Sequence, residues 1–501
     1  MIKAFNDFID ERCVGNRRRY GLLFSTDNNK YYYDSGTNKV LKCDELEYGV
    51  FDCILSGKKI TKDEFVDVSL EEQNRVLSAM TDIIEKEKLL KIGERRTFDT
   101  ESFRSVLSNS KCEQLVLELT EKCNFRCKYC IYNDSNYNYR GFGQKDMDFI
   151  TAKAAIDYVL NINENTGSLA FTFYGGEPLI KYELIRECCE YFKSVYLGND
   201  YVFNFTSNLS LITEEMADYF AENSFFITCS LDGDPVSHNQ NRVYNNGIGT
   251  FDDTIKGLRL LYDRFGDKAK TDLLINMVIE EPYTTEKLER IQAFYDDNKW
   301  LGELEIMVSG ADHAIDPSFV VKEDYLYDYI GDWTFDKFIN GKEDVFSIEY
   351  IRRRFGQIYN RCIMDASTDA IPINGCCLPG KRRLFVDTNG DYYLCEKVGC
   401  SPAIGNVNIG IDNKIIQEKY IDEYTSKSIN SCNSCWAVNL CGICYAVCYD
   451  KDGINISKKN NACTFQRFAW KNAFRRYYTL AEADIKLLKK LTGGSNEEKN
   501  V

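Results

Sequence analysis

The chain has 501 residues, of which 44% are hydrophobic and 28% charged, and its formal net charge is −15. That length exceeds one ordinary hydrophobic core, so we expect two to four domains. The acidic balance disfavours a nucleic-acid-binding protein, because no long basic patch is available to neutralise phosphates. The sequence contains no apolar stretch of the length that spans a bilayer, so no membrane association is expected.

The first residues, Met-Ile-Lys-Ala-Phe-Asn-Asp-Phe, lack the apolar run of a secretory signal, which favours a cytoplasmic protein. The cytoplasm is reducing, so the 21 cysteines are expected to bind metal rather than to form disulfides. Because the chain has only 2 histidines, imidazole ligation can have at most a minor part in this metal binding.

Residues 1–100 are predicted to form a small separate domain. We expect three short strands separated by turn residues, at Leu22–Ser25, Lys30–Tyr33 and Val40–Lys42. Helical signals follow at Asp44–Leu55, Thr61–Phe65 and Leu70–Leu90. A three-stranded sheet with three helices is typical of a winged-helix-like domain.

Strand and helix patterns alternate six times between residues 112 and 310. The predicted strands are Leu115–Thr120, Leu169–Tyr174, Val202–Thr206, Phe226–Leu231, Leu273–Ile279 and Leu304–Val308. The predicted helices lie near 151–161, 180–196, 213–222, 251–264 and 284–298. This alternation predicts an α/β fold, a partial (β/α)6 barrel of the TIM type with parallel strands. In such barrels the chemistry lies at the carboxyl ends of the strands.

Residues 311–370 are predicted to form a helical connector, and residues 371–492 a cysteine-rich domain. An amphipathic helix or helix pair is expected from Phe465 to Leu491, and the residues from Gly493 onward are expected to fray. The cysteine-rich segment before that helix has little apolar periodicity. We therefore expect metal sites, rather than a hydrophobic core, to hold this segment together.

Cys123, Cys127 and Cys130 directly follow the first predicted barrel strand, in the run Leu-Thr-Glu-Lys-Cys-Asn-Phe-Arg-Cys-Lys-Tyr-Cys. Three thiolates on one loop can hold three irons of a cubane cluster and leave the fourth iron open to a substrate. A structural zinc site completed from elsewhere, or three buried cysteines without metal, are the alternatives. The place of the loop and the motifs that follow it favour the open cluster.

Glycine and small polar residues follow the next three predicted strands. They are Gly175-Gly176-Glu177-Pro178 after the second strand, Ser207-Asn208 after the third, and Ser230, Asp232 and the later Arg242 after the fourth. Taken singly, these are ordinary turn residues. Together they line one rim of a barrel with groups suited to a ribose and a carboxylate, and the two glycines let the backbone approach a ligand closely.

A second group of cysteines occupies the C-terminal region: Cys377, Cys395, Cys432, Cys435, Cys441, Cys444, Cys448 and Cys463, with Cys376 and Cys400 as further candidates. The spacing alone permits two tetrathiolate sites, which could hold either zinc or iron–sulfur clusters.

Residues 112–310 resemble the radical S-adenosylmethionine (SAM) enzymes, through the cysteine triplet with Tyr129 and the motifs at the later strand ends. The resemblance implies that Cys123, Cys127 and Cys130 hold a [4Fe–4S] cluster that binds SAM and cleaves it to a 5′-deoxyadenosyl radical. It further implies SAM contacts from Gly175, Gly176, Glu177 and Pro178 (methionine ammonium), Ser207, Asn208, Ser230 and Asp232 (ribose and methionine), Arg242 (carboxylate) and Tyr129 (adenine).

The C-terminal cysteines resemble the SPASM extension of peptide-modifying radical SAM enzymes, which carries two auxiliary [4Fe–4S] clusters. This implies three clusters in all, with Cys377, Cys395 and Cys444 on the first auxiliary cluster and Cys432, Cys435, Cys441 and Cys463 on the second. The family separates its last pair by three residues, whereas two residues separate Cys441 from Cys444. Cys448 therefore competes with Cys444, and Cys376 with Cys377. The fourth ligand of the first auxiliary cluster is left open: a spare cysteine, or a substrate thiolate.

The N-terminal segment from Tyr31 to Phe65 resembles the RiPP recognition element, a winged-helix-like module that binds the leader of a ribosomally made, modified peptide (RiPP). Binding would occur by strand addition at the sheet edge. A purely structural cap and a DNA-binding winged helix are the alternatives, and the acidic charge opposes the second.

The resemblances together imply an enzyme that forms Cys thioether crosslinks in a precursor peptide, with an external flavodoxin- or ferredoxin-type electron donor. The alternatives are a maturase that forms carbon–carbon or ether crosslinks, and an anaerobic sulfatase maturase that makes formylglycine. A non-enzymatic, metal-stabilised peptide-binding scaffold is the alternative from another class. No residue in the sequence identifies a general base.

Overall fold

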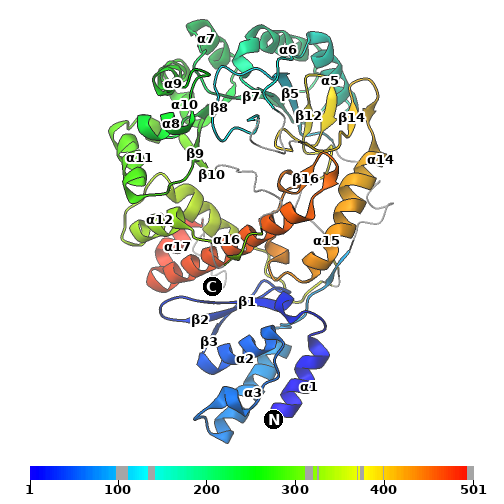
Figure 1. The fold of residues 1–501 in the computed structure, drawn as a ribbon, viewed down its shortest axis with the longest axis vertical. Coiled ribbons are helices and arrows are strands. Elements are labelled where there is room, and N and C mark those ends of the chain that lie inside the picture. The colour runs from blue at the N-terminus through cyan, green and yellow to red at the C-terminus, as the bar shows by residue number, and fades with distance from the viewer. Residues whose placement is uncertain are drawn as a thin grey trace.

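A computed structural model of the chain describes residues 1–96, 111–133, 141–310, 320–323, 326–368, 370–372, 377–398 and 400–492. The molecule is elongated, with a large α/β sheet at one end, an N-terminal unit at the other, and helices between them (Figure 1). The competing ligand Cys376 and part of the predicted connector lie outside the described residues. Within those residues, no helix is both long and apolar enough to cross a membrane.

The N-terminal unit is an antiparallel sheet of β1 (Gly21–Ser25), β2 (Lys30–Asp34) and β3 (Val40–Cys43), with helices α1 (Ile2–Arg12), α2 (Glu45–Ser56) and α3 (Leu70–Lys86). The three strands and the last two helices lie where the sequence predicts them. A capping box between Asp44 and Glu47 starts α2, and Gly57, with φ +75°, ends it. The first helix, α1, was not predicted.

Six parallel strands form the large sheet: β5 (Gln114–Thr120), β6 (Leu169–Gly175), β7 (Tyr201–Ser207), β8 (Phe226–Ser230), β9 (Leu273–Ile279) and β10 (Glu305–Gly310). Crossover helices cover its outer face: α5 (Phe149–Ile162), α6 (Tyr182–Val195), α7 (Glu214–Glu222), α9 (Phe251–Phe265) and α11 (Thr285–Asp297). Alternate strand residues such as Phe171, Phe173 and Phe205 point into the core beneath these helices. The prediction of an α/β fold with a parallel sheet is confirmed. Two short helices, α8 (Pro235–Asn241) and α10 (Ala269–Asp272), were not predicted.

The cysteine-rich segment extends this sheet. β12 (Leu384–Val386) pairs in parallel with β5, and β13 (Asp391–Tyr393), β14 (Gly405–Asn406) and β15 (Gly410–Ile411) follow in antiparallel order. The segment also places Leu384, Tyr392 and Tyr420 in the same buried core as the barrel strands. The expectation that metal sites, rather than a hydrophobic core, hold the cysteine-rich segment together is therefore wrong. Sparse apolar residues suffice because they pack on a core that already exists.

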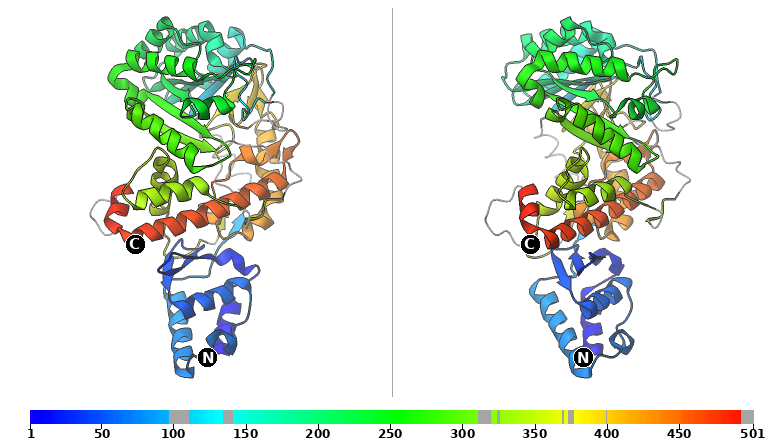
Figure 2. Two further views of the ribbon diagram at one scale, coloured as in Figure 1. Left: turned by 60° about the vertical axis from the view of Figure 1, so that its left-hand side comes forward. Right: turned by 90° about the vertical axis from the view of Figure 1, so that its left-hand side faces the viewer.

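Helices separate the sheet from the N-terminal unit (Figures 1 and 2). They are α12 (Tyr329–Ile339), α13 (Arg354–Tyr359), α15 (Glu423–Asn433), α16 (Ile456–Ala483) and α17 (Ile485–Leu491), with a π-helical turn over Ile348–Arg353 before α13 and another over Ile416–Asp422 after α14 (Asn413–Ile415). The predicted C-terminal helix pair is present, but α16 begins before Phe465. Its first turns are polar and carry no helical apolar period.

Two small pairs complete the described strands: β4 (Glu94–Arg96) with β11 (Ala370–Pro372), and β16 (Tyr449–Asp450) with β17 (Gly453–Ile454). On the side facing the helices, the N-terminal sheet packs Phe24 and Tyr31 against Phe474 and Tyr478 of α16. The N-terminal unit is thus joined to the rest of the molecule through an aromatic interface rather than through a linker alone.

Candidate active site

The cysteine triplet lies on the loop that follows β5, at the carboxyl edge of the parallel sheet. Cys127 is buried, and Cys123 and Cys130 are partly exposed. The loop is held from one side by two backbone hydrogen bonds, from the amide of Arg126 to Val243 O (2.7 Å) and from the amide of Lys128 to Asn241 O (3.0 Å). The end of α8 and the segment after it therefore position the cysteine loop, which no local sequence pattern indicates.

Backbone amides also approach the sulfur atoms. The amide of Phe125 donates to Cys123 Sγ, and the amide of Tyr132 donates to Cys130 Sγ, both at 3.4 Å. Burial raises the pKa of the Cys127 thiol to about 12, while the positive charge of Arg242 opposes this rise. Metal binding would deprotonate these thiols, because the thiolate is the ligand form.

Two glycines at the end of β6 seat the cysteine loop. A Cβ on Gly176 would lie 2.2 Å from Lys122 O and 3.0 Å from Cys123 Cβ, and one on Gly175 would lie 2.3 Å from Thr120 O. Gly175 also has a backbone φ of +137°, a conformation that residues with a side chain rarely adopt. The amide of Gly176 donates to Thr120 O at 2.9 Å. The site thus combines three thiols with a backbone cradle that admits no side chain, and this donor set fits an iron–sulfur cluster.

Glu177, which follows the glycines, is turned into the protein. Its carboxylate accepts hydrogen bonds from Ser207 Oγ (2.8 Å), from the amide of Asn208 (2.9 Å) and from the amide of Leu179 (3.1 Å). Burial raises its pKa to about 7. The structure thus brings the predicted residues Glu177, Ser207 and Asn208 together and ties the end of β6 to the end of β7. Pro178 begins the short 3-10 helix Pro178–Lys181 that Glu177 caps.

Asp232, after β8, is the centre of a second buried network. Arg242 donates to its carboxylate through Nε (2.9 Å) and Nη2 (3.1 Å), and the Tyr129 hydroxyl donates to Oδ2. The amide of Val278, on β9, also donates to Oδ1 at 2.9 Å. The guanidinium carbon of Arg242 lies 5.4 Å from the centre of the Tyr129 ring. Three residues predicted to contact SAM separately therefore form one charge-paired unit beside Cys127.

The remaining predicted contacts lie at the same edge. Asn208 donates through Nδ2 to Asn124 Oδ1 at 2.9 Å, which links β7 to the cysteine loop. Ser230 is buried and pairs in register with Asn276 of β9. Asn124 and His238 complete these networks but were not among the predicted site residues. The position of Asn124 directly after the first cysteine of the triplet is the signal that could have identified it.

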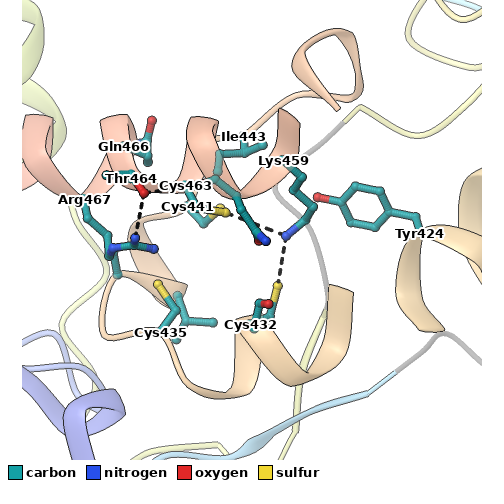
Figure 3. A pocket seen from close by; sticks show the side chains of 14 residues that line it. Tyr424, Cys432, Cys435, Cys441, Ile443, Lys459, Cys463, Thr464, Gln466 and Arg467 are labelled. Atoms are coloured by element: carbon teal, nitrogen blue, oxygen red, sulfur yellow. Dashed lines mark hydrogen bonds between the residues drawn. The ribbon is translucent and has the colours of Figure 1, made fainter. Parts of the chain in front are cut away.

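Four C-terminal cysteines line one cavity of about 330 Å³ (Figure 3). Cys432 lies on α15, Cys435 and Cys441 flank the short helix Val438–Leu440, and Cys463 lies on α16. These are the four residues predicted for the second auxiliary cluster. The cavity is about ten times the volume of one water molecule, so it has room for a group larger than a single ion.

The residues predicted for the first auxiliary cluster also lie together. Burial raises the pKa of Cys395, and the charge of Cys444 raises it further. Burial also raises the pKa of Cys444, and there the charge of Cys377 adds to the rise. Cys448 is fully buried; burial raises the pKa of its thiol to about 12, and the charges of Lys459, Cys463, Cys444 and Cys441 also act on it. Cys400 is partly buried, near Lys458. These interactions link Cys444 to Cys377 and Cys395, and they link it to Cys448 as well. Among the described residues, no three His, Cys, Asp or Glu side chains close round a single ion.

Comparison of the sequence with known proteins identifies a family match and several relatives. Residues 117–294 match the family model of the radical SAM superfamily. The radical SAM cyclopropyl synthase TigE of Paramaledivibacter caminithermalis is 23% identical, over 92% of this chain and 95% of its own length. A cysteine-type anaerobic sulfatase-maturating enzyme of Clostridium novyi is 24% identical, over 65% of this chain and 86% of its own length.

Among solved structures, native anSMEcpe with bound AdoMet aligns over 76% of this chain and all of its own, with 19% identity and a TM-score of 0.54. At that identity the alignment supports the fold. The family match covers the strands that carry the cysteine loop, the glycine cradle and the Asp232 network. The chain is therefore an enzyme, and its residues 117–294 form a radical SAM region.

Proposed function

We propose that this protein is a maturase that modifies a ribosomally made precursor peptide and forms thioether crosslinks from its cysteines. The observation that carries the proposal is the cysteine loop of residues 123–130, seated by Gly175 and Gly176 at the carboxyl edge of a parallel sheet, in a chain that also carries a separate N-terminal sheet unit.

Three [4Fe–4S] clusters and SAM are the cofactors of this proposal. Cys123, Cys127 and Cys130 would hold the first cluster, and when bound it would supply an electron to SAM and so a 5′-deoxyadenosyl radical. Cys377, Cys395 and Cys444 would hold the second, and Cys432, Cys435, Cys441 and Cys463 the third. An external flavodoxin- or ferredoxin-type protein would be the electron donor.

The chain's own residues orient rather than exchange protons. Asp232 fixes Arg242 and Tyr129 against the cysteine loop, and Glu177 fixes the ends of β6 and β7. Both carboxylates are buried and fully engaged in hydrogen bonds inside the protein, so they hold the rim rigid. Abstraction of a hydrogen atom requires close placement of the substrate carbon, and a rigid rim favours this positioning.

The N-terminal unit is the second support for a peptide substrate. β3 pairs with β2, and in the described part of the chain no further strand continues the sheet beyond β3. An open edge of this kind can take an extended leader peptide by strand addition. The match to TigE covers 92% of this chain, so the unmatched part is shorter than the N-terminal unit. The match must therefore include part of that unit. The anSMEcpe structure, in contrast, aligns completely and still leaves about a quarter of this chain unmatched.

A second candidate function is the formation of carbon–carbon bonds in the peptide. It is favoured by one observation: a relative that matches along nearly the whole chain is a cyclopropyl synthase. Maturation of a sulfatase is the third candidate, supported by matches to three-quarters of the chain or less.

One assay separates the three. The protein, purified and reconstituted without air, is incubated with SAM, dithionite and a synthetic precursor peptide whose gene neighbours this one, and the peptide is then alkylated with iodoacetamide and weighed by mass spectrometry. A thioether product has lost two hydrogens and one alkylatable thiol. A carbon–carbon product has lost two hydrogens and kept all thiols. A cysteine converted to formylglycine has lost its sulfur and two hydrogens and gained one oxygen.

The control is the Cys123→Ala/Cys127→Ala/Cys130→Ala variant, which should form no product and no 5′-deoxyadenosine while still binding the peptide. The maturase proposal is contradicted if the wild-type enzyme cleaves SAM but leaves the peptide unchanged. It is also contradicted if the triple variant forms the product.

A further inference from the structure

Lys459 enters the four-cysteine cavity from α16 (Figure 3). Although lysine is normally an exposed residue, its side chain is only 2% exposed. Its ammonium group donates to Cys432 Sγ at 3.6 Å and to Cys463 Sγ at 3.8 Å, and it lies 5.6 Å from the centre of the Tyr424 ring. Lys459 precedes Cys463 by four residues, so both side chains lie on the same face of the helix.

A buried ammonium group is costly unless an anion or strong acceptors surround it. Here the sulfur atoms serve as acceptors, and the charge of Lys459 acts on Cys463, Cys432, Cys448 and Cys441. Arg467 lines the same cavity, where its charge acts on Cys435. The cavity is therefore bordered by two cations in a chain whose net charge is −15.

The charged side chains that act on Cys395 and Cys444, in the other C-terminal cysteine group, are balanced in sign rather than uniformly positive. Cys444 is acted on by Lys397 and Glu396, whose charges are opposite. The two groups of cysteines thus differ in local charge, although both would present thiolates to a cluster.

We propose that Lys459 raises the reduction potential of the cluster held by Cys432, Cys435, Cys441 and Cys463, and so makes it the stronger electron acceptor of the two auxiliary clusters. The inference rests on the proposed function, which places a cluster there. A cluster with four thiolates is anionic, and reduction adds one more negative charge. A fixed positive charge within hydrogen-bond reach of two ligand sulfurs stabilises the reduced form more than the oxidised form.

The test is a potentiometric titration followed by EPR spectroscopy. It uses the full chain with Cys123→Ala/Cys127→Ala/Cys130→Ala, reconstituted with iron and sulfide, so that the signals come from the C-terminal clusters. Lys459→Gln should shift one midpoint potential to a more negative value and leave the other unchanged. Lys459→Arg, which keeps the charge, should restore most of the shift. Lys471→Gln, an exposed site on the same helix, is the control with the same change in net charge and should shift neither potential.

Unchanged midpoint potentials in Lys459→Gln would overturn the inference. Loss of the cluster's iron in Lys459→Gln would overturn it as well, because the side chain would then serve assembly rather than potential. The cluster itself is tested separately: iron and sulfide content should fall by one cluster in Cys432→Ala/Cys435→Ala. If this content does not fall, the proposed cluster at this cavity is absent, and the failure belongs to the proposed function.

Discussion

At the scale of single residues, the site depends on backbone contacts that residue type alone does not reveal. The sequence predicted that Tyr129, Asp232 and Arg242 each meet the cofactor. The structure shows that the three also bind one another, because Asp232 takes hydrogen bonds from both partners and from the amide of Val278. The residues could be selected from their positions after strands. Their pairing could not, because it depends on how the loop after β5 folds onto the segment after α8.

The close approach of Gly176 to the cysteine loop gives the first prediction. Gly176→Ala places a Cβ 2.2 Å from Lys122 O, so the loop must move and the three thiols lose their mutual geometry. We expect iron content to fall by about one cluster and SAM binding, measured by equilibrium dialysis, to fall at least ~10-fold, roughly 1.4 kcal/mol. Gly302→Ala is the matched control, because its Cβ would meet open space. Normal iron content in Gly176→Ala would contradict the seating role of this glycine.

His238 gives a prediction for pH. It is fully buried; its Nδ1 accepts from the amide of Asp232 (3.3 Å), and its Nε2 lies 3.1 Å from Thr250 Oγ1. Burial lowers its pKa to about 4. Because the unfolded imidazole has a pKa near 6.5, the unfolded chain binds more protons between these values. The stability that the neutral imidazole contributes is therefore fully present above about pH 6.5, and it is lost as the pH falls toward 4.

The magnitude of this loss is about 3 kcal/mol. Urea titrations at a series of pH values should show it as a decline in the free energy of unfolding that is steeper in the wild type than in His238→Gln, which cannot titrate there. Thr250→Val, which keeps the imidazole, should retain the wild-type slope. Equal slopes in wild type and His238→Gln would show that this histidine is not held neutral.

At the scale of elements, the positions of the strands were predicted better than the pairing between them. The six barrel strands lie within a few residues of the predicted ranges, because their apolar runs are bounded by turn residues. The pairing of β12 with β5 could not be predicted, since it joins residues more than two hundred positions apart and β12 has only three residues. The early start of α16 was missed for another reason: the turns that carry Lys459 and Cys463 are polar, and helical periodicity needs apolar residues.

The contact between the N-terminal sheet and α16 can be tested at Glu482. Its carboxylate accepts from Tyr31 Oη (2.6 Å), from Thr26 Oγ1 (2.8 Å) and from Asn28 Nδ2 (3.3 Å). Glu482→Ala removes these bonds and should weaken the docking of the sheet by about 2 kcal/mol, because bonds to a charged acceptor are strong. Hydrogen exchange of the β1 and β2 amides should become faster. Lys471→Ala, on the exposed face of α16, should leave their exchange unchanged. If both variants exchange alike, the carboxylate does not hold the sheet.

At the scale of the whole molecule, the N-terminal unit contacts the loop between two of the proposed cluster ligands, Cys435 and Cys441. Ser35 lies at the turn after β2; its Oγ donates to Trp436 O at 2.7 Å, and Asn439 Nδ2 donates to Ser35 O at 2.6 Å. The ring of Tyr33 lies 6.1 Å from that of Trp436. Trp436 and Asn439 lie between Cys435 and Cys441, two residues proposed to bind the same cluster. The unit proposed to bind the leader thus shares a surface with a cluster loop.

This shared surface predicts that loss of the cluster increases the conformational freedom of the N-terminal unit at the turn that contains Ser35. With iron bound, two ligand bonds would fix both ends of the loop Trp436–Leu440, and the turn at Ser35 would rest on a rigid support. Cys435→Ser/Cys441→Ser removes those bonds, so the loop gains conformational freedom and its hydrogen bonds to Ser35 open more often. Hydrogen exchange in the anaerobic, reconstituted protein should therefore become faster both in residues 436–440 and in residues 35–37.

Cys123→Ser is the control for that experiment, because Cys123 follows β5 in the large sheet, away from the N-terminal unit (Figure 1). It should lower the iron content to a similar extent and leave exchange at residues 35–37 as in the wild type. A second contact restrains the same turn, from the amide of Met364 to Thr37 O at 2.8 Å, so the acceleration should be graded rather than complete. If the double variant accelerates residues 436–440 alone, the two hydrogen bonds to Ser35 do not transmit the state of the cluster, and the N-terminal unit is held independently of it.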